Sequence, residues 1–129
     1  MAPTIDVIGI VVADMAASLS FYRRLGLEIP EVSADEDHVE VALPGGLRLA
    51  FDTAKNVQSF HPDWSPASGG PRTSLAFACD SPAEVDQVYA DLVAAGYAGA
   101  KEPWDAFWGM RYALLHDPDG NGVDLFARL

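Results

Sequence analysis

The chain has few basic residues and a single cysteine. Lys and Arg together number 8 against 19 Asp and Glu, so the formal net charge at pH 7 is -11. Because nucleic acid backbones and anionic membrane surfaces attract positively charged proteins, we expect neither as a partner. One cysteine, Cys79, excludes an internal disulfide framework and a cysteine-rich zinc site. We expect Cys79 to be a small buried apolar residue.

Long apolar segments are also lacking. No apolar run approaches the roughly 20 residues of a membrane span, and residues 1–6 lack the charged and apolar regions of a secretory signal peptide. We therefore expect a cytoplasmic protein. Hydrophobic residues still make up 50% of the 129 residues, which is enough to build the core of a single domain over residues 1–129.

The first half of the sequence predicts a strand, a helix and a hairpin. An apolar, β-branched run at 5–12 is typical of a buried strand. Asp14 is placed as the N-cap of a helix over 15–25, which Gly26 ends. A short strand is predicted over 27–32, where Pro30 indicates a sheet edge. Two alternating stretches then predict a hairpin, at residues 38–43 and 47–52.

The second half predicts the same order of elements. After a strand over 73–79, Ser81, Pro82 and Glu84 form a capping box, the start of a helix that reaches about residue 95. The remaining elements are a turn region at 98–102, strands at 110–116 and 123–127, and the turn DPDGNG at 117–122. We read that turn as a tight hairpin turn, because it lacks the further ligands of a calcium loop.

The two halves align as an internal repeat. Residues 7–13 lie over 74–80 at an offset of 67, and the closing segments GLRL and GVDL also match, at 46–49 and 122–125. We predict an α+β fold of two βαβββ repeats, residues 1–55 and 73–129, joined by a loop over 56–72. Eight strands would form a curled mixed sheet around a cleft, with the helices outside.

Strand alternation divides each half-sheet into an apolar face and a mixed face. The apolar face would cover the helix of its own half. The mixed face would line the cleft and carries these residues: Val7, Gly9, Arg48, Ala50, Asp52, Ser74, Ala76, Asp124 and Phe126. Two carboxylates and a guanidinium on this face indicate a ligand cleft rather than a dry core.

These features resemble a known family. The segment VADMAASLSFYRRLGLE at 12–28, the closing DPDGNGVDLF at 117–126 and the repeated βαβββ unit are similar to the vicinal oxygen chelate superfamily. That superfamily includes glyoxalase I, extradiol dioxygenases, and fosfomycin and bleomycin resistance proteins. The resemblance covers essentially the whole chain and favours a bleomycin-resistance-like member.

The resemblance also implies where a metal would bind. Enzymes of the superfamily hold a divalent metal with four inward side chains, usually His, Glu or Gln, from the first and last strand of each half. The repeat places these positions at Val7, Arg48, Ser74 and Asp124. Valine cannot ligate, a guanidinium repels a cation, and Ser74 with one carboxylate is too poor a ligand set. We therefore expect no cofactor, and a divalent metal only at an atypical site.

Several other residues remain candidates with more than one interpretation. Arg48 and Asp124 are predicted to pair across the cleft, to bind polar ligand groups, or to be two solvated charges. None of the histidines has a partner at a metal-motif spacing, and His38 is the best candidate for the cleft. Aromatic residues gather at Trp104, Phe107, Trp108 and Tyr112, with Trp64 in the central loop. They are typical either of ligand stacking or of dimer and core packing.

The sequence as a whole predicts a homodimer that binds a small aromatic molecule without a metal, as a resistance or sequestration protein. Its acidic charge favours a cationic ligand. The predicted ligand-binding residues are Val7, His38, Glu40, Arg48, Asp52, Ser74, Trp104, Trp108, Arg111 and Asp124. The alternative is an enzyme: a lyase, isomerase or dioxygenase with an atypical metal site at His38, Glu40 and Asp124, or a metal-free isomerase or hydrolase with His38 or Asp124 as general base.

Overall fold

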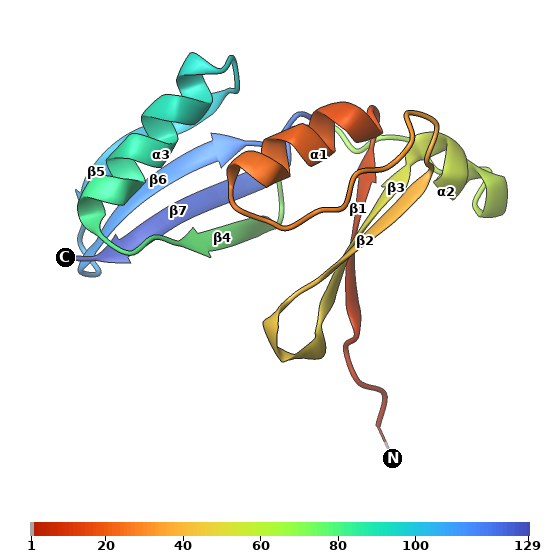
Figure 1. Ribbon diagram of the computed structural model, residues 1–129, viewed down its shortest axis with the longest axis horizontal. Helices are drawn as coiled ribbons and strands as arrows, with labels where there is room; N and C mark the ends of the chain where they lie inside the picture. The colour runs from red at the N-terminus through yellow and green to blue at the C-terminus, as the bar shows by residue number, and fades with distance from the viewer. Residues whose placement is uncertain (1) are drawn as a thin grey trace. The chain divides into compact units, whose positions relative to one another are not determined.

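The computed structural model describes residues 2–129 and divides the chain into two compact units, Met1–Ser68 and Gly69–Leu129. Each unit holds one mixed sheet (Figure 1). The boundary falls inside the predicted joining segment 56–72. None of the helices within residues 2–129 combines the length and the apolar character that a membrane span requires.

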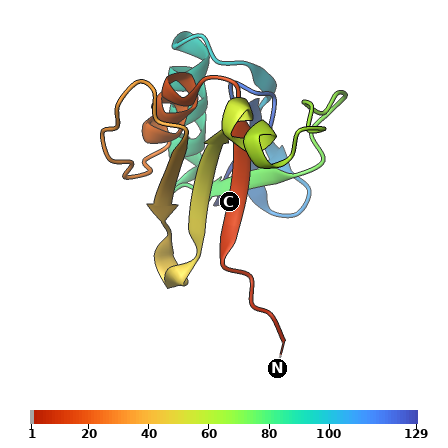
Figure 2. The same ribbon diagram turned by 90° about the vertical axis from the view of Figure 1, so that its right-hand side faces the viewer.

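The first unit is a three-stranded sheet in the order β1-β3-β2, which Figure 2 shows strand by strand. Strands β1 and β3 are parallel, and β2 and β3 form the predicted antiparallel hairpin through a short turn at Pro44–Gly46. The elements are β1 (Val7–Val12), α1 (Met15–Arg24), β2 (His38–Ala42), β3 (Arg48–Thr53) and α2 (Ala54–Phe60).

Helix α1 begins and ends where the sequence predicts. The Asp14 carboxylate accepts a hydrogen bond from the amide of Ala17, and the chain leaves the helix through Gly26 at φ +93°. The Tyr22 ring of α1 packs 5.2 Å from the Phe51 ring of β3, centroid to centroid. This contact fixes the helix on the apolar face of its sheet.

The predicted strand over 27–32 does not form, so the first unit has one strand fewer than the second. Pro30 has no amide hydrogen to donate to a neighbouring strand. The Arg23 guanidinium also donates to the carbonyl oxygens of Ile29 and Pro30, at 3.2 and 2.7 Å. These carbonyls therefore bond to a side chain in place of a β partner.

The predicted loop after β3 contains a helix. Thr53 caps α2 by accepting a hydrogen bond from the amide of Asn56, and the helix buries its own Val57. The polar composition, with prolines and glycines farther along, hid this helix of about two turns from sequence analysis. Only the segment after Phe60 lacks regular structure as predicted.

The second unit is a four-stranded sheet in the order β4-β7-β6-β5, with α3 packed on one face (Figure 1). Ser81 accepts a hydrogen bond from the amide of Glu84, and the Glu84 carboxylate accepts one from the amide of Asp80, so the predicted capping interactions form. The elements are β4 (Ser74–Ala78), α3 (Pro82–Ala94), β5 (Gly99–Ala106), β6 (Met110–His116) and β7 (Gly122–Arg128).

Strand β5 corrects the prediction of a turn at 98–102. Its pairing with β6 shifts register between Gly99 and Lys101 and again between Lys101 and Trp104. These irregularities break the period-two pattern by which a strand is recognised. After the second shift Trp104 lies directly opposite Tyr112. The aromatic segment therefore belongs to a sheet rather than to a loop.

Residues 2–129 thus form seven strands in two separate sheets, not one curled sheet of eight. The βαβββ order is complete in the second unit, whereas the first unit lacks the strand that directly follows its helix. The closing turn is tight, as predicted: the Asp117 carboxylate accepts from the amides of Asp119 and Asn121, and Gly120 has φ +85°. The single domain over 1–129 stays a prediction.

Candidate functional site

Strand register confirms the predicted faces of both sheets. Residues predicted to cover a helix, such as Leu49 and Phe51 in the first unit and Val123 and Leu125 in the second, are buried. The alternate residues Arg48, Asp52, Asp124 and Phe126 are less buried, whereas Ala50, which was also predicted to line the cleft, is buried. We call the face of the second sheet opposite α3 the open face. It carries the predicted residues Ser74 and Asp124.

Five rings form an aromatic cluster in the second unit: Trp104 on β5, Phe107 and Trp108 in the β5–β6 turn, Tyr112 on β6 and Phe126 on β7. Tyr112 is the central ring, with centroids 5.7 Å from Trp104, 5.3 Å from Trp108 and 6.2 Å from Phe126. Most of these pairs meet edge to face, which leaves ring faces without an aromatic partner.

The outer part of the aromatic cluster is open to solvent. Phe107 is 97% exposed and Trp108 is 46% exposed. The Lys101 ammonium lies 4.3 Å from the centroid of the Trp104 ring, so one ring face already binds a cation. A flat cationic molecule would find the same kind of contact on Trp108.

A carboxylate adjoins these rings. The Tyr112 hydroxyl donates to Asp124 at 2.6 Å. Burial, together with the negative charge of Asp124, raises the pKa of Tyr112 to about 12. The phenol therefore keeps its proton near neutral pH and holds the carboxylate beside the aromatic cluster.

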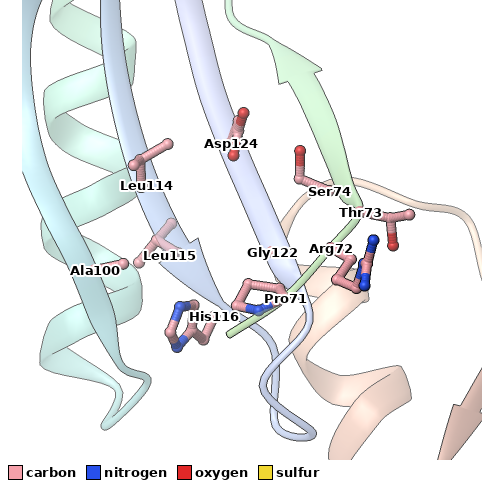
Figure 3. A pocket seen from close by; sticks show the side chains of 10 residues that line it. All are labelled: Pro71, Arg72, Thr73, Ser74, Ala100, Leu114, Leu115, His116, Gly122 and Asp124. Carbon is pink, nitrogen blue, oxygen red and sulfur yellow. The ribbon is translucent and has the colours of Figure 1, made fainter. Parts of the chain in front are cut away.

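A pocket of about 200 Å³ continues the open face beyond Asp124 (Figure 3). Its wall combines charged, hydroxyl and apolar groups. The lining residues are Pro71, Arg72, Thr73, Ser74, Ala100, Leu114, Leu115, His116, Gly122 and Asp124. Binding pockets for drug-sized molecules measure about 300–1,000 Å³. This pocket is therefore large enough for a polar head group but not for a whole drug-sized ligand.

The four positions implied for a metal do not fit one. Val7 lies opposite Arg48 in the first unit, whereas in the second unit Asp124 lies opposite Ala76, two residues beyond Ser74. Neither pair supplies two metal donors, and the guanidinium would repel a cation. Within residues 2–129 no group of three or more His, Cys, Asp or Glu side chains is arranged to hold a metal ion.

The remaining predicted residues of the first unit form a charged ladder on the face opposite α1. Arg48 donates to Asp6 at 2.5 Å and to Glu40 at 2.6 Å. His38 lies between Glu40 and Asp52, with its ring nitrogens 2.8 and 2.6 Å from their oxygens. The ladder thus comprises Asp6, Arg48, Glu40, His38 and Asp52. Asn56 of α2 also donates to the Asp52 carboxylate.

These contacts bear on two of the predictions. Both ring nitrogens of His38 face carboxylates, so a general base at this position would first have to break one contact. Arg48 and Asp124 each have a partner in their own unit. Their predicted pairing concerns both units and stays a prediction.

The ladder predicts a pH-dependent stability. A neutral imidazole donates from one nitrogen only, so both contacts of His38 require the protonated ring. Hydrogen bonds to Asp52 and Glu40 raise the pKa of His38 above 6.5, and the bond from His38 lowers the pKa of Glu40 below 4.5. The His38 contribution is complete below pH 6.5 and is lost as the pH rises through the raised value. The Glu40 contribution is complete above pH 4.5 and is lost on acidification.

We therefore expect His38→Gln to lower Tm near pH 5.5 and to leave it unchanged near pH 9. The shift should be less than about 5 °C because these side chains are largely exposed. Thermal unfolding of both proteins across this pH range measures it. An equal loss of Tm at both pH values would mean that His38 contributes by packing instead of charge.

Two further residues lie away from the open face. Arg111 donates to Asp86 of α3 at 2.9 Å and to Asp105 at 3.1 Å, on the α3 side of the sheet. Its predicted role in ligand binding stays a prediction. Cys79 is half-buried rather than buried, and burial raises the pKa of its thiol to about 11. At neutral pH it is a thiol and a poor nucleophile.

Of the ten residues that line the pocket, only Ser74 and Asp124 were predicted, and the polar side chains that the sequence did not single out are Arg72, Thr73 and His116. Arg72 ends the segment that was predicted as the joining loop, Thr73 begins the predicted strand over 73–79, and His116 ends β6. The signal was alternation, because His116 falls on the same side of β6 as Tyr112 and Leu114. Counting from Tyr112 along the strand would have placed His116 on the open face.

Comparison with known proteins decides the family. The family model for the glyoxalase/bleomycin resistance protein/dioxygenase superfamily matches residues 4–125. The chain belongs to this superfamily. A search of curated proteins found no match. The bleomycin-resistance-like membership suggested by the sequence is a finer assignment and stays a proposal.

Solved structures of the superfamily share the fold. A glyoxalase/bleomycin resistance protein/dioxygenase from Nocardioides is 27% identical with a TM-score of 0.75, covering 100% of this chain and 85% of that one. A family enzyme from Burkholderia phytofirmans PsJN is 20% identical with a TM-score of 0.81, covering 98% and 100%. A lactoylglutathione lyase from Agrobacterium tumefaciens is 21% identical with a TM-score of 0.68, covering 98% and 95%.

Proposed function

We propose that this superfamily member binds a small cationic aromatic molecule on the open face of its second unit, without a metal. The observation that carries the proposal is the half-exposed Trp108 ring, packed on Tyr112, whose hydroxyl holds Asp124. Rings with free faces bind flat molecules, and a carboxylate beside them selects positive charge. The net charge of -11 would also draw a cation toward the protein.

The biological role that fits this binding is sequestration of a toxic compound, as in bleomycin-resistance-like proteins. A homodimer, also expected from the sequence, belongs to the same proposal. The exposed Phe107 at the β5–β6 turn supports either role, because an exposed ring serves a ligand or a partner copy equally well.

The test uses proflavine, a flat cationic tricycle, as probe. Isothermal titration calorimetry should show saturable binding to the wild type and a Kd at least about 10-fold weaker for Trp108→Ala, because an aromatic contact with a cation is lost. Trp64→Ala is the matched control: it also removes a tryptophan, but one that belongs to the first unit and not to the aromatic cluster. Equal affinity of Trp108→Ala and wild type, or no binding by the wild type, would refute the proposal.

A further inference from the structure

The pocket beyond Asp124 has opposite charges on its wall that do not bond to each other. Arg72 and Asp124 both line it, yet no ion pair or hydrogen bond joins them in the part of the chain that the structure describes. In Figure 3 Ser74 lies between the two side chains. Asp124 accepts from Tyr112, whereas the Arg72 guanidinium has no hydrogen-bonding or ionic partner within residues 2–129.

Arg23 and Arg128 also have no acidic partner within residues 2–129, but Arg72 is the arginine that lines the pocket. Arg48 and Arg111 each bond to two carboxylates. Arg72, in contrast, lies among side chains that can donate hydrogen bonds to an anion. The side chains of Thr73, Ser74 and His116 also make no hydrogen bond within residues 2–129 and line the same pocket.

These donors form an anion subsite. A guanidinium offers paired N–H groups that match the two oxygens of a carboxylate, and hydroxyl groups can supply further donors. Asp124, on the other side of Ser74, would repel the same anion unless the ligand also brings a positive charge. A head group with both charges satisfies both sides of the pocket.

We infer that the ligand carries a zwitterionic head group of the amino acid type, attached to an aromatic ring. Its carboxylate binds at Arg72, Thr73 and Ser74, its ammonium at Asp124, and its ring on the aromatic cluster through Tyr112. The pocket volume of about 200 Å³ suits a head group of this size, with the ring outside it. This inference rests on the proposed function and adds the anionic group to it.

Three small probes that share a phenethyl skeleton and carry different charged groups test the inference. Phenethylamine carries the ammonium alone, 3-phenylpropionate the carboxylate alone, and phenylalanine both. By isothermal titration calorimetry, phenylalanine should bind the wild type about 10-fold more tightly than phenethylamine, because a charge-assisted bond to Arg72 is added. 3-Phenylpropionate should bind most weakly, since Asp124 repels it.

Two variants test whether Arg72 causes the tighter binding of phenylalanine. In Arg72→Gln the 10-fold preference for phenylalanine over phenethylamine should disappear, while phenethylamine binding is unchanged. Lys55→Gln is the control, because it removes one exposed positive charge from the first unit. A preference that persists in Arg72→Gln, or wild-type phenylalanine binding no tighter than phenethylamine, overturns the inference and leaves the proposed function intact. Failure of all three probes and of proflavine overturns both.

Discussion

Phe51→Ala should lower the free energy of unfolding by about 3–5 kcal/mol, the usual loss for a large buried aromatic residue. Phe51 is 0% exposed in the centre of the first sheet. It lies opposite Val39 on one side and Ile10 on the other, and its ring packs against Tyr22 of α1. Alanine would leave a cavity that β1, β2 and α1 could not move inward to fill.

Urea unfolding followed by circular dichroism measures this loss. Phe60→Ala is the matched control, because the same substitution in the same unit removes a ring that is 71% exposed. It should change stability by less than about 0.5 kcal/mol. Similar losses in the two variants would contradict the placement of Phe51 in the core.

Tyr112→Ala should weaken proflavine binding about 10- to 30-fold, because cation–π and stacking contacts of this kind contribute about 1.5–2 kcal/mol. Tyr112 contacts Trp104, Trp108 and Phe126 and holds Asp124, so its removal disturbs every part of the proposed surface. Calorimetric titration of the folded variant measures the change in Kd.

Tyr112→Phe separates the ring from its hydroxyl. It keeps the aromatic contacts and loses only the hydrogen bond to Asp124, so proflavine affinity should stay within about threefold of wild type. If the two variants lose affinity equally, the hydroxyl and its carboxylate determine binding, and the stacking account is wrong. If neither variant changes the affinity, proflavine binds elsewhere.

Much of the fold could be predicted because local signals agreed with the packing. Asp14 and Ser81 cap their helices through side-chain hydrogen bonds, and alternation along the strands identified the buried faces. The errors arose where the decisive contact leaves no mark in the residue pattern. The Arg23 side chain donates hydrogen bonds to carbonyl oxygens of the predicted strand over 27–32. Register shifts in β5 interrupt the regular alternation of side chains by which a strand is recognised.

Individual residues of the candidate site could be predicted from the sequence, but the contacts between them could not. The repeat identified Arg48 and Asp124 as polar positions on strand faces, yet it could not show that Asp6 and Glu40 bond to Arg48 or that Tyr112 bonds to Asp124. Side-chain partners depend on register between strands distant in sequence. The pocket lined by Arg72 could not be predicted for the same reason. It depends on the β4–β7 register, which brings the start of β4 beside Gly122.

The central claim is that a cationic aromatic ligand binds the open face without a metal. The most direct measurement is calorimetric titration of the wild type with proflavine, first after treatment with a chelator and then after addition of Zn²⁺ or Mn²⁺. The account predicts saturable binding with the same Kd in all three samples, because no residue of the surface depends on a metal for its position. Binding that appears only with added metal, or none up to millimolar proflavine, would contradict it.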